Sequence, residues 1–168
     1  MKNLSAALCL VVFSSLLLVS CGKSSQVKQL ESDLSKRVMQ LHDSGMAKMR
    51  QARTLTAQLD SALALHDSLA GKFPKESAGH NSNDINESKQ KLASASSAME
   101  AWMAGHKPYD VNMKHDEAMS KLNADIQELE KVGARFDTAI VDATGTIENH
   151  RKVAAELLAK KPVNKSRK

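Results

Sequence analysis

The sequence predicts an all-α fold, an elongated bundle of three long helices, with a break in the third helix as the alternative that would give four. Apolar residues recur at helical spacing in three long stretches, and no stretch alternates apolar and polar residues like a strand. Glu, Lys, Ala, Leu and Gln, which favour helices, dominate the body of the chain. With 168 residues the chain has the length of one domain. We expect the bundle to cover residues 27–160.

The first predicted helix follows a short polar tether and runs for about forty residues. Gly45 interrupts its middle and is expected to bend it, whereas Gly71, Pro74 and the polar segment 75–84 end it in a loop. Its apolar residues form one continuous stripe: Val27, Leu30, Leu34, Val38, Leu41, Ala52, Leu55, Leu59, Leu63 and Leu69.

The second predicted helix runs from Ile85 to about Gly105, with Asn83 or Asp84 as its cap. Gly105 and Pro108 break the helix. Three of its apolar residues would point inward, with Trp102 beside them: Leu92, Met99 and Met103.

Asp110 is expected to cap the third helix, whose apolar stripe begins at Val111. The stripe keeps its phase past Gly133 and Gly145, which favours one long helix, and a turn at Gly133 is the alternative that gives four helices. The stripe comprises Val111, Met119, Leu122, Ile126, Leu129, Phe136, Ile140, Ile147, Ala154 and Leu158.

The N-terminus has the pattern of a lipoprotein leader. Lys2 is followed by an apolar run, residues 4–18, that is too short to span a bilayer comfortably, and Leu18-Val19-Ser20-Cys21 closes the run. This tetrapeptide resembles the lipobox of bacterial lipoproteins, in which the Cys thiol receives a diacylglyceryl group and the Cys becomes the first residue. The resemblance implies a signal peptide at residues 1–20, lipidation of Cys21 and a lipidated tether at residues 21–26. An ordinary cleaved signal peptide or a single short anchor is the alternative.

Lipidation would place the chain in the cell envelope as a membrane-anchored protein. Two or three acyl chains hold a protein firmly, whereas one holds it only marginally. Gly22 stands where an Asp commonly retains lipoproteins in the inner membrane, so we expect the outer membrane, with the chain facing the periplasm. Cys9 would leave with the leader, so residues 22–168 hold no thiol for a disulfide, a Cys-ligated zinc site or a nucleophile.

Charge is concentrated at the C-terminus, where the last nine residues, KKPVNKSRK, include five basic ones. The basic tail, residues 161–168, is suited to contact anionic lipid headgroups or the cell wall. One Trp, one Tyr and three Phe are too few to interleave with basic residues in a nucleic-acid interface. We therefore expect no nucleic-acid partner.

A His-Asp doublet with a Lys six places after the His occurs three times, beginning at His42, His66 and His115. Met residues accompany two of the copies on the same helix flank or stripe, and soft sulfur with imidazole suits Cu(I). If the first and third helices are parallel and His42 and His115 lie at comparable heights, one copper site becomes available. Its candidate ligands are His42, Met46, Met49, His115 and Met119.

The doublets also have structural and enzymatic interpretations. Met at helical spacing fills core gaps, and an Asp that directly follows a His points to a different side of the helix. The copies at His42 and His115, 73 residues apart, then record a duplicated helix. His-Asp doublets are also similar to the metal-binding doublet of HD-type phosphohydrolases, and a Ser-His-Asp triad is formally available, but no phosphate-binding Gly-rich loop or strained nucleophile turn accompanies them. We expect a non-catalytic binding or scaffold protein.

Two resemblances add to this expectation. The lipobox, the HDSGMAKM segment from His42 to Met49 and the AMEAWMAGHKPY segment from Ala98 to Tyr109 resemble a group of small helical bacterial lipoproteins, some labelled "viral A-type inclusion protein". That group implies no known activity and no catalytic residue, and a proline often stands in it where this chain has Ala47. The ending KSRK resembles that of the murein lipoprotein, which implies a membrane-to-peptidoglycan tether through Lys168 as an alternative function.

Overall fold

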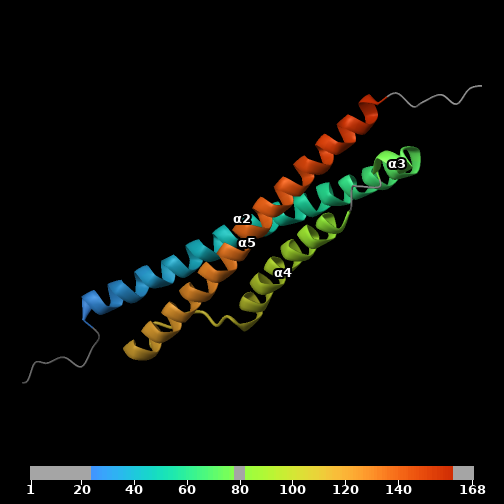
Figure 1. Cartoon of the computed structure of the whole chain (residues 1–168). Helices are drawn as coiled ribbons and strands as arrows, with labels where there is room; N and C mark the ends of the chain where they lie inside the picture. The colour runs from blue at the N-terminus through green and yellow to red at the C-terminus, as the bar shows by residue number, and fades with distance from the viewer. Residues whose placement is uncertain (1–23, 78–81, 161–168) are drawn as a thin grey trace, which may run out of the picture.

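The computed structural model describes residues 24–77 and 82–160. Within these ranges the chain forms four helices and no strand: α2 (Ser25–Lys72), α3 (Pro74–Ser77), α4 (Asn83–Gly105) and α5 (His115–Ala159) (Figure 1). The predicted all-α bundle of three long helices is confirmed. The helix α5 continues past Gly133 and Gly145, so the alternative in which a turn at Gly133 divides the third long helix into two is wrong. The predicted leader, Cys21 and the basic tail with Lys168 lie outside the described residues.

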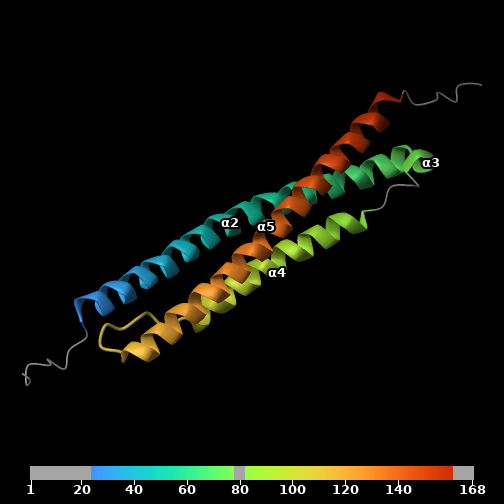
Figure 2. The ribbon, with the colours of Figure 1, turned by 60° about the vertical axis from the view of Figure 1, so that its left-hand side comes forward.

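The helices α2 and α5 run parallel, and α4 runs antiparallel to both along part of their length (Figures 1 and 2). Because this is an up-down-up arrangement, the described chain enters at one end of a rod and leaves at the other. Three contacts fix the register of α2 against α5: Glu31 with His115, Lys48 with Asp137, and His66 with His150.

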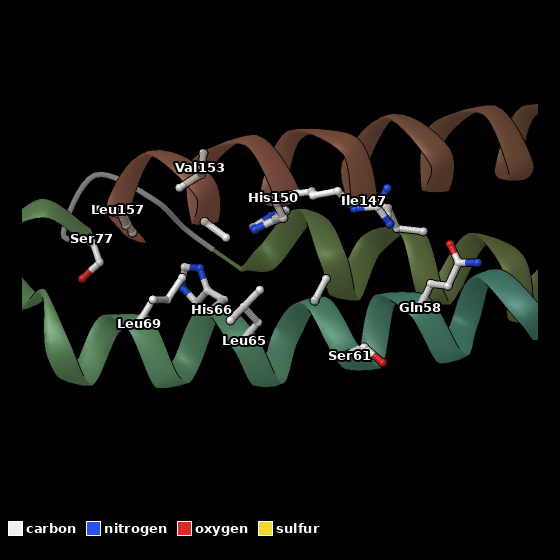
Figure 3. Close-up of a pocket in the computed structure, with 13 residues that line it drawn as sticks. Gln58, Ser61, Leu65, His66, Leu69, Ser77, Ile147, His150, Val153 and Leu157 are labelled. Atoms are coloured by element: carbon white, nitrogen blue, oxygen red, sulfur yellow. The ribbon is translucent and has the colours of Figure 1, made fainter. Parts of the chain in front are cut away.

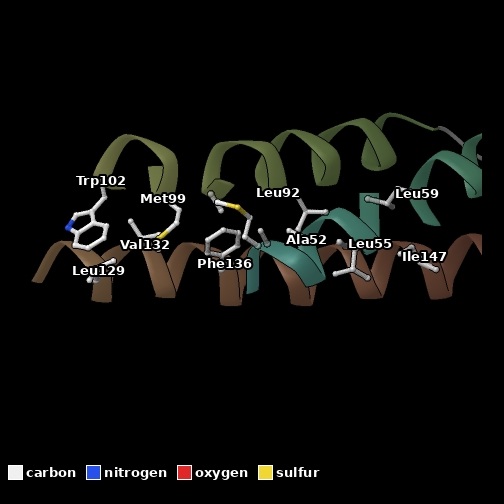
Figure 4. Close-up of a cluster of buried hydrophobic side chains, with 14 of the residues drawn as sticks. Ala52, Leu55, Leu59, Leu92, Met99, Trp102, Leu129, Val132, Phe136 and Ile147 are labelled. Atoms are coloured by element: carbon white, nitrogen blue, oxygen red, sulfur yellow. The ribbon is translucent and has the colours of Figure 1, made fainter. Parts of the chain in front are cut away.

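The core lies where α2, α4 and α5 meet (Figure 4). Its largest side chains that are fully buried are Leu59, Ile85, Leu92, Met99, Leu122 and Phe136. A smaller cluster of Leu69, Ala154 and Leu157 joins the last turns of α2 to the last turns of α5. Leu30 and Leu158, which the apolar stripes place inward, are exposed because they lie near the outer ends of the long helices, where fewer elements cover them.

The helix α5 begins at His115, four residues later than the predicted start at Val111. Asp110 does not cap this helix, since its Oδ1 accepts hydrogen bonds from the backbone N and Nδ2 of Asn112 and closes a turn in the loop. Val111 is 70% exposed and belongs to this loop. The Tyr109 hydroxyl donates to Glu31 and holds this loop on α2. Residues 106–114 therefore form the connection from α4 to α5, and α5 begins only after it.

Gly45 lies inside the continuous α2 helix, where it faces Met99 of α4. A Cβ at this position would lie 3.0 Å from Met99 Sδ and 3.1 Å from Met99 Cε. Met99 is fully buried, so it has little room to move aside. The glycine therefore serves packing between helices at the place where the sequence suggested a bend.

Two glycine substitutions should have opposite effects on stability. Gly45→Val should lower the free energy of unfolding by about 1–3 kcal/mol, because the added atoms overpack the contact with Met99. Gly145→Ala should raise it by about 0.5–1 kcal/mol, because a Cβ there meets nothing within 4 Å and alanine favours the helix. Urea unfolding followed by far-UV circular dichroism measures both. An unchanged free energy of unfolding in Gly45→Val would show that the Met99 side chain can move to accommodate the added atoms.

Candidate functional site

The three His-Asp doublets lie at three different levels of the rod, and the His of each contacts another element. His115 contacts Glu31, His42 contacts Trp102, and His66 contacts His150. Asp67 and Asp116 are exposed to solvent. Asp43 is exposed as well, so the repeated motif places imidazoles between helices while all three of its carboxylates remain exposed to solvent.

Glu31 is fully buried and joins three parts of the chain. Its Oε1 lies 2.8 Å from His115 Nδ1 at the start of α5, and its Oε2 accepts a 2.5 Å hydrogen bond from the Tyr109 hydroxyl. Because a carboxylate only accepts, the His115 Nδ1 is the donor in the first contact. The hydrogen bond to Glu31 and, to a smaller extent, burial raise the pKa of Tyr109 to about 12. This cluster fixes the connection between α4 and α5 to α2.

His42 lies beside a stack of two rings at the C-terminal end of α4. Its ring centroid is 5.8 Å from that of Trp102, which stacks on His106 at 4.4 Å. Within the described parts of the chain, the buried Trp102 Nε1 and His106 Nδ1 have no hydrogen-bond partner, although Asp125 Oδ2 is 3.4 Å from the latter. His42 Nδ1 also lies 3.0 Å from Asp43 Oδ1. The expectation that adjacent His and Asp diverge is wrong here, because the exposed Asp43 side chain folds back to the ring edge.

The five candidate copper ligands do not converge. His115 is level with Glu31, whereas His42 is eleven residues farther along α2, or about 16 Å along its axis. The expectation of comparable heights is wrong because the contacting residues of α2 and α5 are 84 residues apart, not the 73 that separate the repeated motifs. Met49 is buried in the core, where its Sδ lies 3.6 Å from Arg53 Nη2, and Met46 and Met119 are partly buried.

The His66 doublet, which has no accompanying Met, lies beside a cavity between α2 and α5. His150 is 8% exposed, and its Nε2 lies 2.9 and 3.1 Å from the two carboxylate oxygens of Asp84. Asp84 also accepts a 2.9 Å hydrogen bond from the backbone N of Ile85 at the start of α4. The His66 and His150 rings meet edge to face with centroids 5.6 Å apart. His150 of α5 therefore contacts both His66 of α2 and Asp84 of α4, and so joins the three long helices.

The cavity beside these rings lies between α2 and α5 and has a volume of about 210 Å³ (Figure 3). His66 and His150 point toward one another from the two helices, and Ser77 at the end of α3 contributes to its lining. The remaining walls are mostly apolar: Ala62, Leu65, Leu69, Ile147, Val153, Ala154 and Leu157. The cavity therefore combines an apolar body with a few polar side chains, which is the usual composition of a small-molecule site.

The serines at the cavity do not form a Ser-His-Asp triad. Ser61 Oγ donates to the carbonyl of Ala57 at 3.0 Å, and Ser77 Oγ donates to the carbonyl of Phe73 at 2.7 Å. Neither hydroxyl is hydrogen-bonded to an imidazole. No group of three His, Cys, Asp or Glu that could hold a metal ion occurs in residues 24–77 and 82–160.

No protein-family model, curated protein or solved structure matches this chain. None of the helices in the described ranges is long and apolar enough to cross a membrane.

Sequence reasoning missed Glu31 and Tyr109, and it placed Asp84 only as a helix cap. Glu31 had a detectable signal, because it falls on the same helix face as Val27 and Val38 and so places a charge within an apolar stripe. His150 had the same kind of signal, three residues after Ile147 and four before Ala154. The pairing of His66 with His150 depends on the register between helices, which no single helix reveals.

Proposed function

We propose that this chain is a lipid-anchored, helical-bundle lipoprotein of the bacterial cell envelope that acts by binding and not by catalysis. The observation that carries the proposal is the placement of the cavity relative to the expected anchor. Ser25 begins α2 four residues after Cys21, and the cavity residues of α2 run from Gln58 to Leu69. At 1.5 Å per residue the cavity is about 50–65 Å along α2 from the membrane end.

This arrangement suits a protein that holds a binding site away from a bilayer surface. The lipobox supports attachment at one end, and the rod between the two ends is built from α2 and α5 without a break in either helix. A chain attached to the outer membrane would present the cavity inside the periplasm. Partners there would be envelope proteins, peptidoglycan or small molecules in that compartment.

The proposal predicts that Cys21→Ser abolishes membrane attachment, because only the thiol of residue 21 can receive the acyl chains. In cells grown with radiolabelled palmitate, the native chain should be labelled and should sediment with the outer membrane. The Cys21→Ser variant should be unlabelled and absent from that fraction. Cys9→Ser is the matched control, since this residue belongs to the expected leader, and it should leave labelling and sedimentation unchanged. An unlabelled native chain that remains in the cytosol would contradict the proposal.

A second candidate function is a membrane-to-peptidoglycan tether. The observation that favours it is that the start of α2 and the end of α5 lie at opposite ends of the rod (Figures 1 and 2). An anchor at Cys21 and a wall linkage at Lys168 would then be spaced apart by the whole bundle. Muramidase digestion of purified sacculi should release peptides that carry Lys168 joined to a wall fragment. If no such peptide is found, the tether function is excluded and the lipid-anchored binding role is unaffected.

A further inference from the structure

We infer that the cavity between α2 and α5 binds a small amphiphilic anion, an acid group on an apolar body with about eight to ten non-hydrogen atoms in all. This inference rests on the proposed role as a binding protein and names the class of ligand. The volume sets the size, because a cavity of about 150 Å³ lined by apolar side chains accommodates benzene. At about 210 Å³, this cavity holds a molecule somewhat larger than benzene.

Apolar side chains on two facing helices supply a site for the body of the ligand. Leu65 and Leu69 come from α2, and Ile147, Ala154 and Leu157 come from α5. Leu65 is 42% exposed at this partly open cavity, so a large apolar side chain contacts solvent there. A hydrocarbon or aromatic group between the helices would remove this surface from water, and such burial favours binding in proportion to apolar area.

Cationic and imidazole groups supply the site for the acid. Arg151 lines the cavity and has no ion-pair partner in the described parts of the chain, and its planar guanidinium is suited to hold a carboxylate through two hydrogen bonds. His66 lines the facing side, and its contact in the described structure is the ring of His150. No Asp or Glu belongs to the described lining of the cavity, and the Asp84 carboxylate, which contacts His150, is already engaged by that imidazole and by the backbone N of Ile85. The unengaged charge that faces the cavity is therefore positive.

The test uses residues 21–168 with Cys21→Ser, which contain every described helix and need no detergent. Isothermal titration with sodium octanoate should give saturable binding at one site, and 1-octanol, which lacks the charge, should bind about tenfold or more weakly. Arg151→Gln should weaken octanoate binding about tenfold, whereas the matched variant Arg50→Gln, at an exposed position of α2, should not change it. Ala62→Leu should reduce binding by filling the cavity, with far-UV circular dichroism and thermal unfolding used to show that each variant is folded.

Several results would overturn the inference: no saturable octanoate binding below about 10 mM, equal affinity for octanol, or unchanged octanoate affinity in folded Arg151→Gln or Ala62→Leu. The test is separate from that of the lipid anchor, because the titrated chain lacks the thiol. If the native chain carries acyl groups but octanoate does not bind, only the ligand class is overturned. If octanoate binds as expected but the native chain carries no acyl group, only the anchor is overturned.

Discussion

Phe136→Ala is expected to lower the free energy of unfolding by about 3–5 kcal/mol. Phe136 is fully buried on α5, in the same cluster as Met99 of α4 and Ala52 of α2, so truncation leaves a cavity at the place where all three long helices meet (Figure 4). Domains of this size are stabilised by only about 5–15 kcal/mol, so the loss would be a large part of the total. Urea unfolding at neutral pH measures it.

Val141→Ala is the matched control for this prediction. Val141 lies on the same helix and is 70% exposed, so its truncation should change the free energy of unfolding by less than about 0.5 kcal/mol. Equal effects of the two substitutions would mean that α5 does not pack against α2 and α4 through the face that contains Phe136.

Glu31→Ala should lower the free energy of unfolding by about 3 kcal/mol. The substitution removes a fully buried carboxylate to which the Tyr109 hydroxyl and His115 Nδ1 donate, and it leaves a gap between α2 and the start of α5. The expected loss of stability lies at the low end of the range for breaking a buried ion pair, because the His115 side chain is 38% exposed and its imidazole can be solvated by water instead. Glu130→Ala, at a half-exposed position 3.5 Å from Arg37, should cost less than about 1 kcal/mol.

The same variant should change how stability depends on alkaline pH. The pKa of Tyr109 is raised to about 12 in the folded chain by the hydrogen bond to Glu31, above its ordinary value of 10.0. Between these values the unfolded chain binds fewer protons than the folded chain, so the contribution of Tyr109 is fully present below pH 10 and is lost as pH rises toward 12. Urea midpoints of the native chain should therefore fall over this interval, and those of Glu31→Ala should fall less. If the urea midpoints of the two chains fell in parallel with pH, the pKa of Tyr109 would not depend on Glu31.

Helical periodicity predicted the number and approximate extent of the long helices because each helix buries one face. The stripe on α5 kept its phase past Gly133 and Gly145, and the structure has one helix there. Periodicity did not predict where α5 begins, because Tyr109 holds the preceding loop on α2 through Glu31, a contact between residues 78 positions apart. Local signals such as Asp110 before an apolar residue cannot report a contact of that kind.

The candidate site was harder to predict because it depends on how one helix is placed along another. The repeated His-Asp motif suggested that His42 and His115 are equivalent, but equivalence in sequence does not make two residues neighbours. The contacts of Glu31 with His115 and of His66 with His150 set the register, and this register pairs His66, the copy without Met, with an imidazole that no motif identified. The cavity follows from this pairing and from the absence of α4 beside the last turns of α2 in the described structure.

The parallel arrangement of α2 and α5 has a mechanical consequence. A tension applied between the start of α2 and the end of α5 would act along the long axis and would shear the two helices past one another. Ion pairs and buried side chains distributed along both helices, from Glu31 with His115 to Leu69 with Leu157, would then resist the load together, whereas a hairpin pulled at adjacent ends separates one turn at a time. The three long helices thus place the start of α2 and the end of α5 at opposite ends of the described bundle, so that a pull between them loads the helix contacts in shear.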